Sequence, residues 1–158
     1  MGIAADDRLA DKIMVQDADF DVAAEYQGLL HHNAQAGAVV MFVGLVRDFS
    51  HDSQVQGLYL EHYPAMTHLA LQGIVADARQ RWALQQVSLI HRIGYLAAAD
   101  QIVMVAVSAK HRHEAFAAAE FIMDFLKVKA PFWKKEITSK GDVWVEAKVS
   151  DEEAKDRW

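Results

Sequence analysis

The stretch Ala38-Val-Val-Met-Phe-Val-Gly-Leu-Val46 contains no polar side chain, and Arg47 ends it abruptly. A continuous apolar run of this length, unlike an alternating one, is typical of a strand that is covered on both faces. We therefore predict a buried strand here, followed by a polar loop over residues 48–57. Loops at strand ends commonly carry function, but a lone arginine such as Arg47 is more often only the boundary with solvent.

Strand and helix patterns extend outward from this strand in both directions. Asp21 is suited to cap a helix, Pro64 to occupy the first turn of another, and Ser150 with Glu153 to form a capping box. The sequence predicts strands at 12–16, 38–46, 58–63, 87–93, 102–109, 132–138 and 143–149, and helices at 22–33, 64–82, 111–128 and 150–158. Because strands in such a chain mostly pair with neighbours, we expect an α+β fold with a mixed or largely antiparallel sheet and packed helices.

Composition indicates a single globular domain over residues 1–158, of which 1–11 are expected to be flexible. The chain is 53% hydrophobic and 24% charged, which fits a soluble globular protein. The lack of cysteine excludes a disulfide framework, a thiolate nucleophile and a Cys-based zinc site, and fits a cytoplasmic location. No apolar run reaches membrane-span length, and a net charge of −6 gives no general reason to bind nucleic acid.

Four lysines nevertheless gather in the run from Phe125 to Glu136. Pro131 cannot continue a helix, so the chain turns between Lys127 and Lys134 and can bring their ammonium groups together. Such a pair would favour a neutral, nucleophilic amine, and it could equally hold a phosphate or a carboxylate. Lysines at a helix C-terminus are also favoured by the helix dipole, so a merely solvated face is the alternative interpretation.

The triplet His111-Arg112-His113 forms a second group of interest, where a strand is expected to give way to a helix. A helix N-terminus with an arginine is suited to bind an anion, although exposed first-turn side chains explain the same pattern. Residues two apart on a helix do not share a face, and the other histidines lack ligand spacing, so we expect no metal site. The common glycine-rich motifs for nucleotides and the nucleophile elbow of α/β-hydrolases do not occur.

Six segments, taken together, carry a resemblance to a known family. They are Phe42-Val-Gly-Leu-Val-Arg47, Leu60-Glu-His-Tyr-Pro-Ala-Met66, Ile90-His-Arg-Ile-Gly94, Ser108-Ala-Lys-His-Arg112, Phe121-Ile-Met-Asp-Phe-Leu-Lys127 and Ala130-Pro-Phe-Trp-Lys-Lys-Glu136. In this order and spacing, over about residues 37–149, the chain resembles the large, catalytic subunit of molybdopterin synthase. The resemblance implies an α+β fold with a hammerhead-like β element, arranged as a central homodimer with one small subunit at each end.

The resemblance also implies a reaction and the residues that perform it. The family transfers sulfur from the C-terminal Gly-Gly thiocarboxylate of a small ubiquitin-like subunit to cyclic pyranopterin monophosphate, which becomes the dithiolene of molybdopterin. It needs no cofactor of its own. By resemblance, Lys127 is the principal catalytic residue and Lys134 its companion. The residues expected to bind the substrate or the tail are Leu45, Val46, Arg47, His111, Arg112, Lys135 and Glu136.

Leu45 departs from the family pattern, where lysine is frequent at this position. A side-chain role for this position is therefore in doubt, whereas backbone contacts from Leu45 and Val46 could persist. Lys129 stands where arginine is frequent. The alternative function is a non-catalytic module that uses the same cationic pocket to bind an anion or a partner protein.

Overall fold

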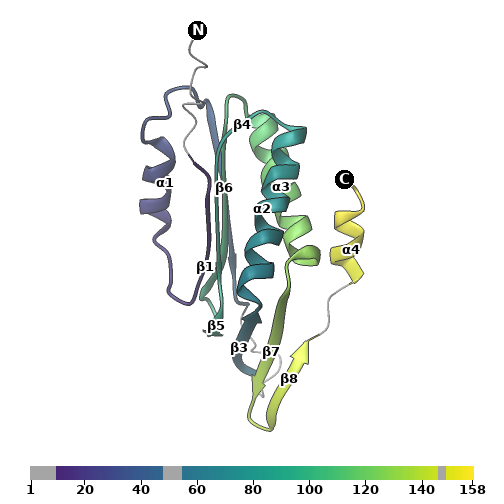
Figure 1. The fold of residues 1–158 in the computed structure, drawn as a ribbon. Helices are drawn as coiled ribbons and strands as arrows, with labels where there is room; N and C mark the ends of the chain where they lie inside the picture. Colours follow the sequence, from purple (N-terminus) through teal and green to yellow (C-terminus); the bar gives the residue numbers. More distant parts are fainter. Residues whose placement is uncertain (1–9, 48–54, 146–148) are drawn as a thin grey trace.

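The computed structural model describes residues 10–47, 55–145 and 149–158. Four helices and eight strands lie in these ranges (Figure 1). In chain order they are β1 (Lys12–Gln16), α1 (Val22–Leu30), β2 (Ala38–Leu45), β3 (Val55–His62), α2 (Pro64–Arg81), β4 (Leu84–Arg92), β5 (Gly94–Leu96), β6 (Gln101–Ala109), α3 (Arg112–Lys129), β7 (Phe132–Thr138), β8 (Gly141–Val145) and α4 (Val149–Lys155).

The strands form two sheets of four strands each, and the predicted α+β class is confirmed. The first sheet has the order β1-β4-β6-β2, in which only β1 and β4 are parallel. The second, β5-β3-β7-β8, is antiparallel throughout and extends from one end of the first (Figure 1). Strand β5 was not predicted, because its three residues lie in a segment that the sequence patterns suggest is a turn.

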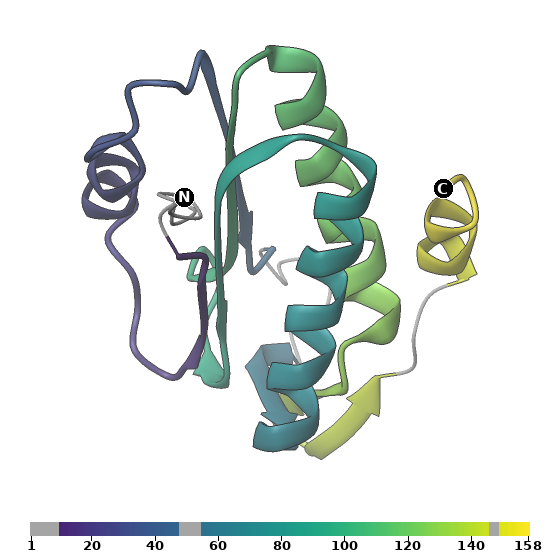
Figure 2. The ribbon, with the colours of Figure 1, turned by 45° about the horizontal axis from the view of Figure 1, so that its top comes forward.

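The main hydrophobic core lies between the first sheet and helices α2 and α3, whereas α1 covers the opposite face (Figure 2). Alternate residues of β4 separate the two layers, since Leu89 packs toward α2 and α3 and Ile90 toward α1. Small residues on α3, such as Ala115 and Ala118, let this helix approach the sheet closely. Every residue of β6 from Val103 to Ala109 is buried, which makes β6 the central strand of the core.

The apolar run at residues 38–45 is not the buried strand that the sequence suggested. Strand β2 lies at an edge of the first sheet, and none of its residues is fully buried. Phe42 keeps 42% of its surface exposed. The prediction was wrong because an apolar run shows only that a strand can be buried, whereas a strand at the edge of a sheet is covered less fully than a central one. Among the described residues, β2 pairs only with β6. The exposed edge therefore remains accessible next to the site described below.

Three boundary predictions are also corrected. Helix α4 begins at Val149, so Ser150 lies inside its first turn and does not cap it. Helix α1 keeps its predicted cap, in which Asp21 accepts from the Ala24 N–H, but it ends at Leu30. Asp11 belongs to the segment expected to be flexible, yet its carboxylate accepts hydrogen bonds from Arg79 and from the Val87 N–H. Residues 1–9 of that segment, and most of the predicted polar loop, lie outside the described residues.

Across the described ranges, no helix is both long enough and apolar enough to cross a membrane.

Candidate active site

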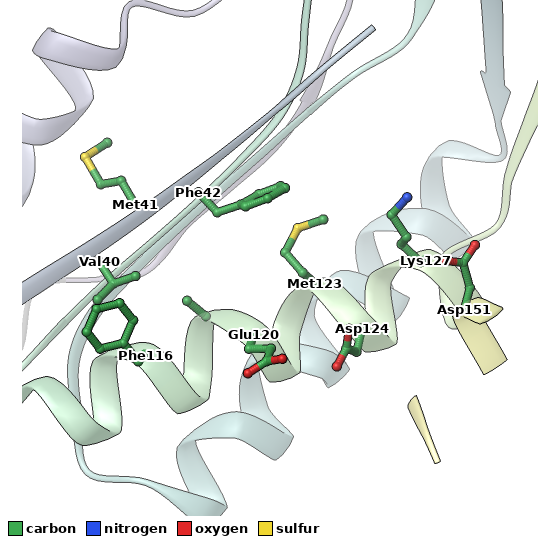
Figure 3. A pocket seen from close by; sticks show the side chains of 10 residues that line it. Val40, Met41, Phe42, Phe116, Glu120, Met123, Asp124, Lys127 and Asp151 are labelled. Atoms are coloured by element: carbon green, nitrogen blue, oxygen red, sulfur yellow. The ribbon is translucent and has the colours of Figure 1, made fainter. Parts of the chain in front are cut away.

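Lys127 lies in the last turn of α3, at one end of a cavity of about 480 Å³ between α3, β2 and α4. The backbone of this turn is fixed because Ile122 and Leu126, on the opposite face of the helix, are buried in the core. The Lys127 side chain itself is exposed. Figure 3 shows Lys127 and Asp151 at one end of the cavity and Phe116 with Val40 at the other. The lysine is therefore held in place by its helix and faces open space.

The cavity has an apolar wall and an acidic wall. Phe42 and Met123 contribute to the apolar side, and Glu120 and Asp124 to the acidic side. Arg157 lies 2.9 Å from a carboxylate oxygen of each of these acids, and the Trp158 indole N–H donates to Asp124 at 2.7 Å. These contacts fasten the C-terminal segment against α3 and partly neutralise the acidic wall.

Lys134 lies on β7, and its strand register defines its surroundings. Lys134 pairs with Leu60 of β3, and Glu136 pairs with Leu58. Because side chains alternate along a strand, Phe132, Lys134 and Glu136 share one face of the second sheet. On that face, Leu58 and Leu60 form a small buried cluster with Val46, which directly precedes Arg47. The fold thus brings residues from the first and second sheets to one region.

The predicted turn at Pro131 is present and is tight. The Phe132 N–H donates to the Ala130 carbonyl at 2.8 Å, and β7 begins immediately afterwards. The Phe132 ring stacks on His91 of β4, and the positive charge of Lys127 acts on the same histidine. Lys127 therefore lies on the side of β7 that carries Phe132 and Lys134.

His91 is buried beneath this region and is neutral at ordinary pH. The pKa of His91 is lowered to about 4, chiefly by burial and to a smaller extent by the charges of His62 and Lys127. Only the hydrogen bond to the Arg92 carbonyl, at 2.7 Å, acts to raise this pKa. The Nδ1 atom of His62 is also buried, and it has no hydrogen-bond partner among the described residues. Two imidazoles that the sequence patterns did not single out therefore adjoin the lysine site.

Lys135 belongs to the opposite face of the second sheet. Its Nζ atom lies 3.6 Å from Asp142 Oδ2, 5.2 Å from the centre of the Tyr59 ring and 5.0 Å from that of Trp144. The structure thus separates Lys135 from its sequence neighbour Lys134, although both are site candidates from the sequence.

The segment Leu45-Val46-Arg47 reaches the site with two exposed side chains and one buried anchor. Val46 is 2% exposed, its N–H donates to the Asp100 carbonyl, and its carbonyl accepts from the Ala99 N–H. Leu45 is 54% exposed and Arg47 is exposed as well. Val46 therefore holds the strand end in place, while its two neighbours are accessible to a ligand.

His111 and Arg112 are exposed at the N-terminus of α3, whereas Lys127 is at its C-terminus. With a rise of about 1.5 Å per residue, the helix separates Arg112 from Lys127 by about 22 Å. Within one chain, these two candidate binding residues are therefore not part of the lysine cluster.

The fold and the site define an α+β protein in which one lysine lies in the last turn of a helix that packs on the first sheet, and another lies on the strand of the second sheet that follows this helix. Residues 15–129 match the family model described as MoaE protein, and the chain belongs to this family. The molybdopterin synthase catalytic subunit of Haemophilus influenzae is 55% identical over 147 residues, which cover 93% of this chain and 97% of the relative.

Solved structures show the same fold. The molybdopterin biosynthesis MoaE protein of Burkholderia ambifaria superimposes with a TM-score of 0.81 at 48% identity and covers 94% of this chain and 97% of that one. A chain from the complex of subunits 1 and 2 of the molybdopterin-converting factor of Helicobacter pylori has a TM-score of 0.69 at 20% identity, with 85% and 89% covered. At that identity, the likeness concerns the fold alone.

Sequence reasoning missed His62, His91 and the C-terminal pair Arg157 and Trp158. Isolated histidines carry no recognisable spacing, and nothing in the sequence indicates that β3 and β4 would place both of them against the Phe132 ring. Only the family segments, which contain both histidines, offered a signal.

Proposed function

We propose that this chain is the catalytic subunit of a molybdopterin synthase and transfers sulfur to cyclic pyranopterin monophosphate. The observation that carries the proposal is the position of Lys127 at one end of a cavity, in a chain that is 55% identical to such a subunit. The sulfur donor is the thiocarboxylate at the C-terminus of a small ubiquitin-like subunit. The cytoplasm, as expected from the lack of cysteine, is where we place the reaction.

The chemistry of the transfer suits the residues of the site. In each transfer the thiocarboxylate sulfur forms a C–S bond to a carbon of the pterin side chain, and a C–O bond of that carbon breaks. Water then cleaves the acyl–sulfur bond, so the partner leaves as a carboxylate and the sulfur stays on the pterin side chain as a thiolate. Negative charge develops on sulfur and oxygen, and ammonium groups at fixed positions stabilise it. Lys127 and Lys134 supply these groups and can exchange protons with the reacting atoms. The sulfur comes from the partner, so the lack of cysteine in this chain is consistent with the mechanism.

The cavity accommodates the donor's tail, and the cations accommodate the substrate's phosphate. An extended Gly-Gly end is narrow enough to lie along the apolar wall, with its terminal group toward Lys127. Arg47 follows the buried anchor Val46 and is accessible for a phosphate, for which a planar guanidinium is well suited. Glu136 shares the Lys134 face and is assigned to the same substrate.

His111 and Arg112 require a second copy of the chain in this proposal. They are about 22 Å from Lys127 along α3, too far to share one ligand with it. A homodimer that joins the N-terminal end of one α3 to the C-terminal end of the other would bring the two groups together. The exposed edge of β2, with Phe42 and Leu45, and the exposed Phe116 offer apolar surface for such an interface.

Reconstitution tests the proposal. The protein is mixed with precursor and thiocarboxylated small subunit, and dithiolene formation is measured for the parent, Lys127→Ala and Lys129→Ala. Lys129 is the matched control, since it is exposed in the same helical turn and lies over the Phe125 ring instead. We expect Lys127→Ala to lose about 10²–10³-fold in turnover and Lys129→Ala to be milder.

Two further arms separate the alternatives. Deleting the Gly-Gly end of the small subunit should abolish turnover, because the tail delivers the sulfur. If the parent binds precursor and partner but forms no product, the alternative of a non-catalytic binding module is correct. Near-parental turnover in Lys127→Ala would show that the lysine run is a solvated face.

A further inference from the structure

The ring of Phe132 contacts histidines from both sheets. It stacks on His91 of β4 with ring centres 3.9 Å apart and planes 15° apart. It also stacks on His62 of β3, at 6.1 Å and 28°. His62 and Phe132 are paired in register within the second sheet, whereas His91 belongs to the first sheet. We call these three rings the aromatic stack; they form a noncovalent connection between the two sheets.

The His91 ring is held rigidly within this stack. It is 6% exposed, and its Nδ1 lies 2.7 Å from the Arg92 carbonyl. A carbonyl can only accept, so Nδ1 carries the proton and donates it, which leaves Nε2 unprotonated in the neutral ring. The Arg92 guanidinium in turn donates to the carbonyls of Asp17 and Gln101. The backbone that orients the imidazole is therefore itself fixed.

The groups around His91 keep it uncharged. From α3 the charge of Lys127 acts on it, and from β3 that of His62, and both oppose its protonation. Its strand neighbours, Val15 of β1 and Val103 of β6, are apolar. A neutral, buried, flat ring with a fixed orientation is suited to packing against another ring and not to donating protons to a substrate.

The separation of the two lysines depends on the position of Phe132. Lys127 belongs to α3, which packs on the first sheet, and Lys134 belongs to β7 of the second sheet. Residues 130–132 connect α3 to β7 along the chain. Through Phe132, the aromatic stack holds this connection against both sheets. We propose that His91 is a positioning residue that fixes the separation of Lys127 and Lys134 by holding Phe132 in place.

Kinetics of the reconstituted sulfur-transfer reaction test this inference. This first test rests on the proposed function, because it measures turnover. His91→Leu removes the ring stack and should lower kcat about 10–100-fold, while the KM for the precursor changes less than about 3-fold. The reason is that a small misplacement of catalytic groups affects the reacting step more than it affects substrate binding. His91→Phe keeps the stack and should restore kcat to within about 3-fold of the parent. His68→Leu is the matched control, since His68 is exposed on α2 and is not one of the three rings of the stack.

A double-mutant cycle shows whether His91 acts through Phe132. If it does, Phe132→Leu alone, His91→Leu alone and the double variant should have similar kcat values, because each removes the same contact. Losses that multiply in the double variant would overturn the proposal. Thermal unfolding accompanies each measurement, and His91→Gln replaces His91→Leu if the latter does not fold, since it keeps a donor for the Arg92 carbonyl and lacks the ring.

A second readout does not depend on sulfur transfer. Lysines are labelled by reductive ¹³C-methylation, and the Lys127 resonance is assigned by its loss in Lys127→Ala. His91→Leu should shift the Lys127 resonance and leave that of Lys129 unchanged. If the parent shows no turnover, the proposed function fails, yet this measurement still decides the positioning role. An unshifted Lys127 resonance, or parental kcat in folded His91→Leu, would refute the role.

Discussion

We predict that His91 makes the folded protein sensitive to acid and that His91→Phe removes this sensitivity. Burial is the main reason that the pKa of His91 falls from 6.5 to about 4. The unfolded chain exposes the ring, so it takes up a proton near pH 6.5, whereas the folded protein does so only near pH 4. The contribution to stability is therefore complete above pH 6.5 and is lost as the pH falls toward 4. At about 1.4 kcal/mol per pKa unit, the whole loss is about 3 kcal/mol, of which about 2 kcal/mol has occurred by pH 5.

Urea unfolding followed by tryptophan fluorescence provides the assay. The free energy of unfolding is measured between pH 7 and pH 4.5 for the parent, His91→Phe and the exposed control His68→Phe. Other groups titrate in the same range, so the informative quantity is the difference between the parent and His91→Phe at each pH. This difference should shift by about 2 kcal/mol in favour of His91→Phe between pH 7 and pH 5, while His68→Phe should follow the parent. Parallel curves for the parent and His91→Phe would refute the reasoning, because they would mean that His91 titrates alike in both states.

The remaining predictions concern turnover and assembly. Lys127→Arg should fail like the alanine variant, because arginine keeps the charge but cannot release a proton, and its thermal midpoint should stay within about 2 °C of the parent; near-parental turnover would mean that charge alone suffices. Mixing Lys127→Ala with Arg112→Ala should restore about a quarter of parental turnover, since half of randomly formed dimers contain one intact site. The control mixture of Lys127→Ala with Lys134→Ala should stay inactive, and the absence of any restoration in the first mixture would place Arg112 outside the shared site. Leu45→Lys should leave turnover within about 3-fold, as expected if that exposed position contributes packing only; a large gain would reveal a missing cation.

Local sequence patterns predicted most elements because those elements depend on local physical preferences. Strand β1 has the predicted bounds, Lys12–Gln16, and α2 begins at Pro64 as expected. Asp21 caps α1 because a short carboxylate reaches a free N–H two or three residues on. Local preferences failed where two outcomes differ little in energy, as at Ser150, which resembles a cap but lies inside α4. They also missed β5, whose three residues pair only because β3 lies beside them.

For the site, the sequence by itself determined which side chains carry charge and where the chain must turn. The lysine run, the turn at Pro131 and the family segments are all readable from residue order, because they depend on neighbours in the chain. Only the tertiary structure decided how these groups are distributed in space. Strand alternation and pairing place Lys134 and Lys135 on opposite faces, and the length of α3 separates Arg112 from Lys127.

The same limit explains the edge position of β2 and the aromatic stack. An apolar run indicates that a strand can be buried. Whether it is buried depends on the order of strands in the sheet, and this order is determined by segments that are distant in the sequence. His62, His91 and Phe132 lie far apart in the sequence and meet only because two sheets join at that point. Contacts of this kind arise from packing between elements, and packing leaves no periodicity in a single sequence from which it could be read.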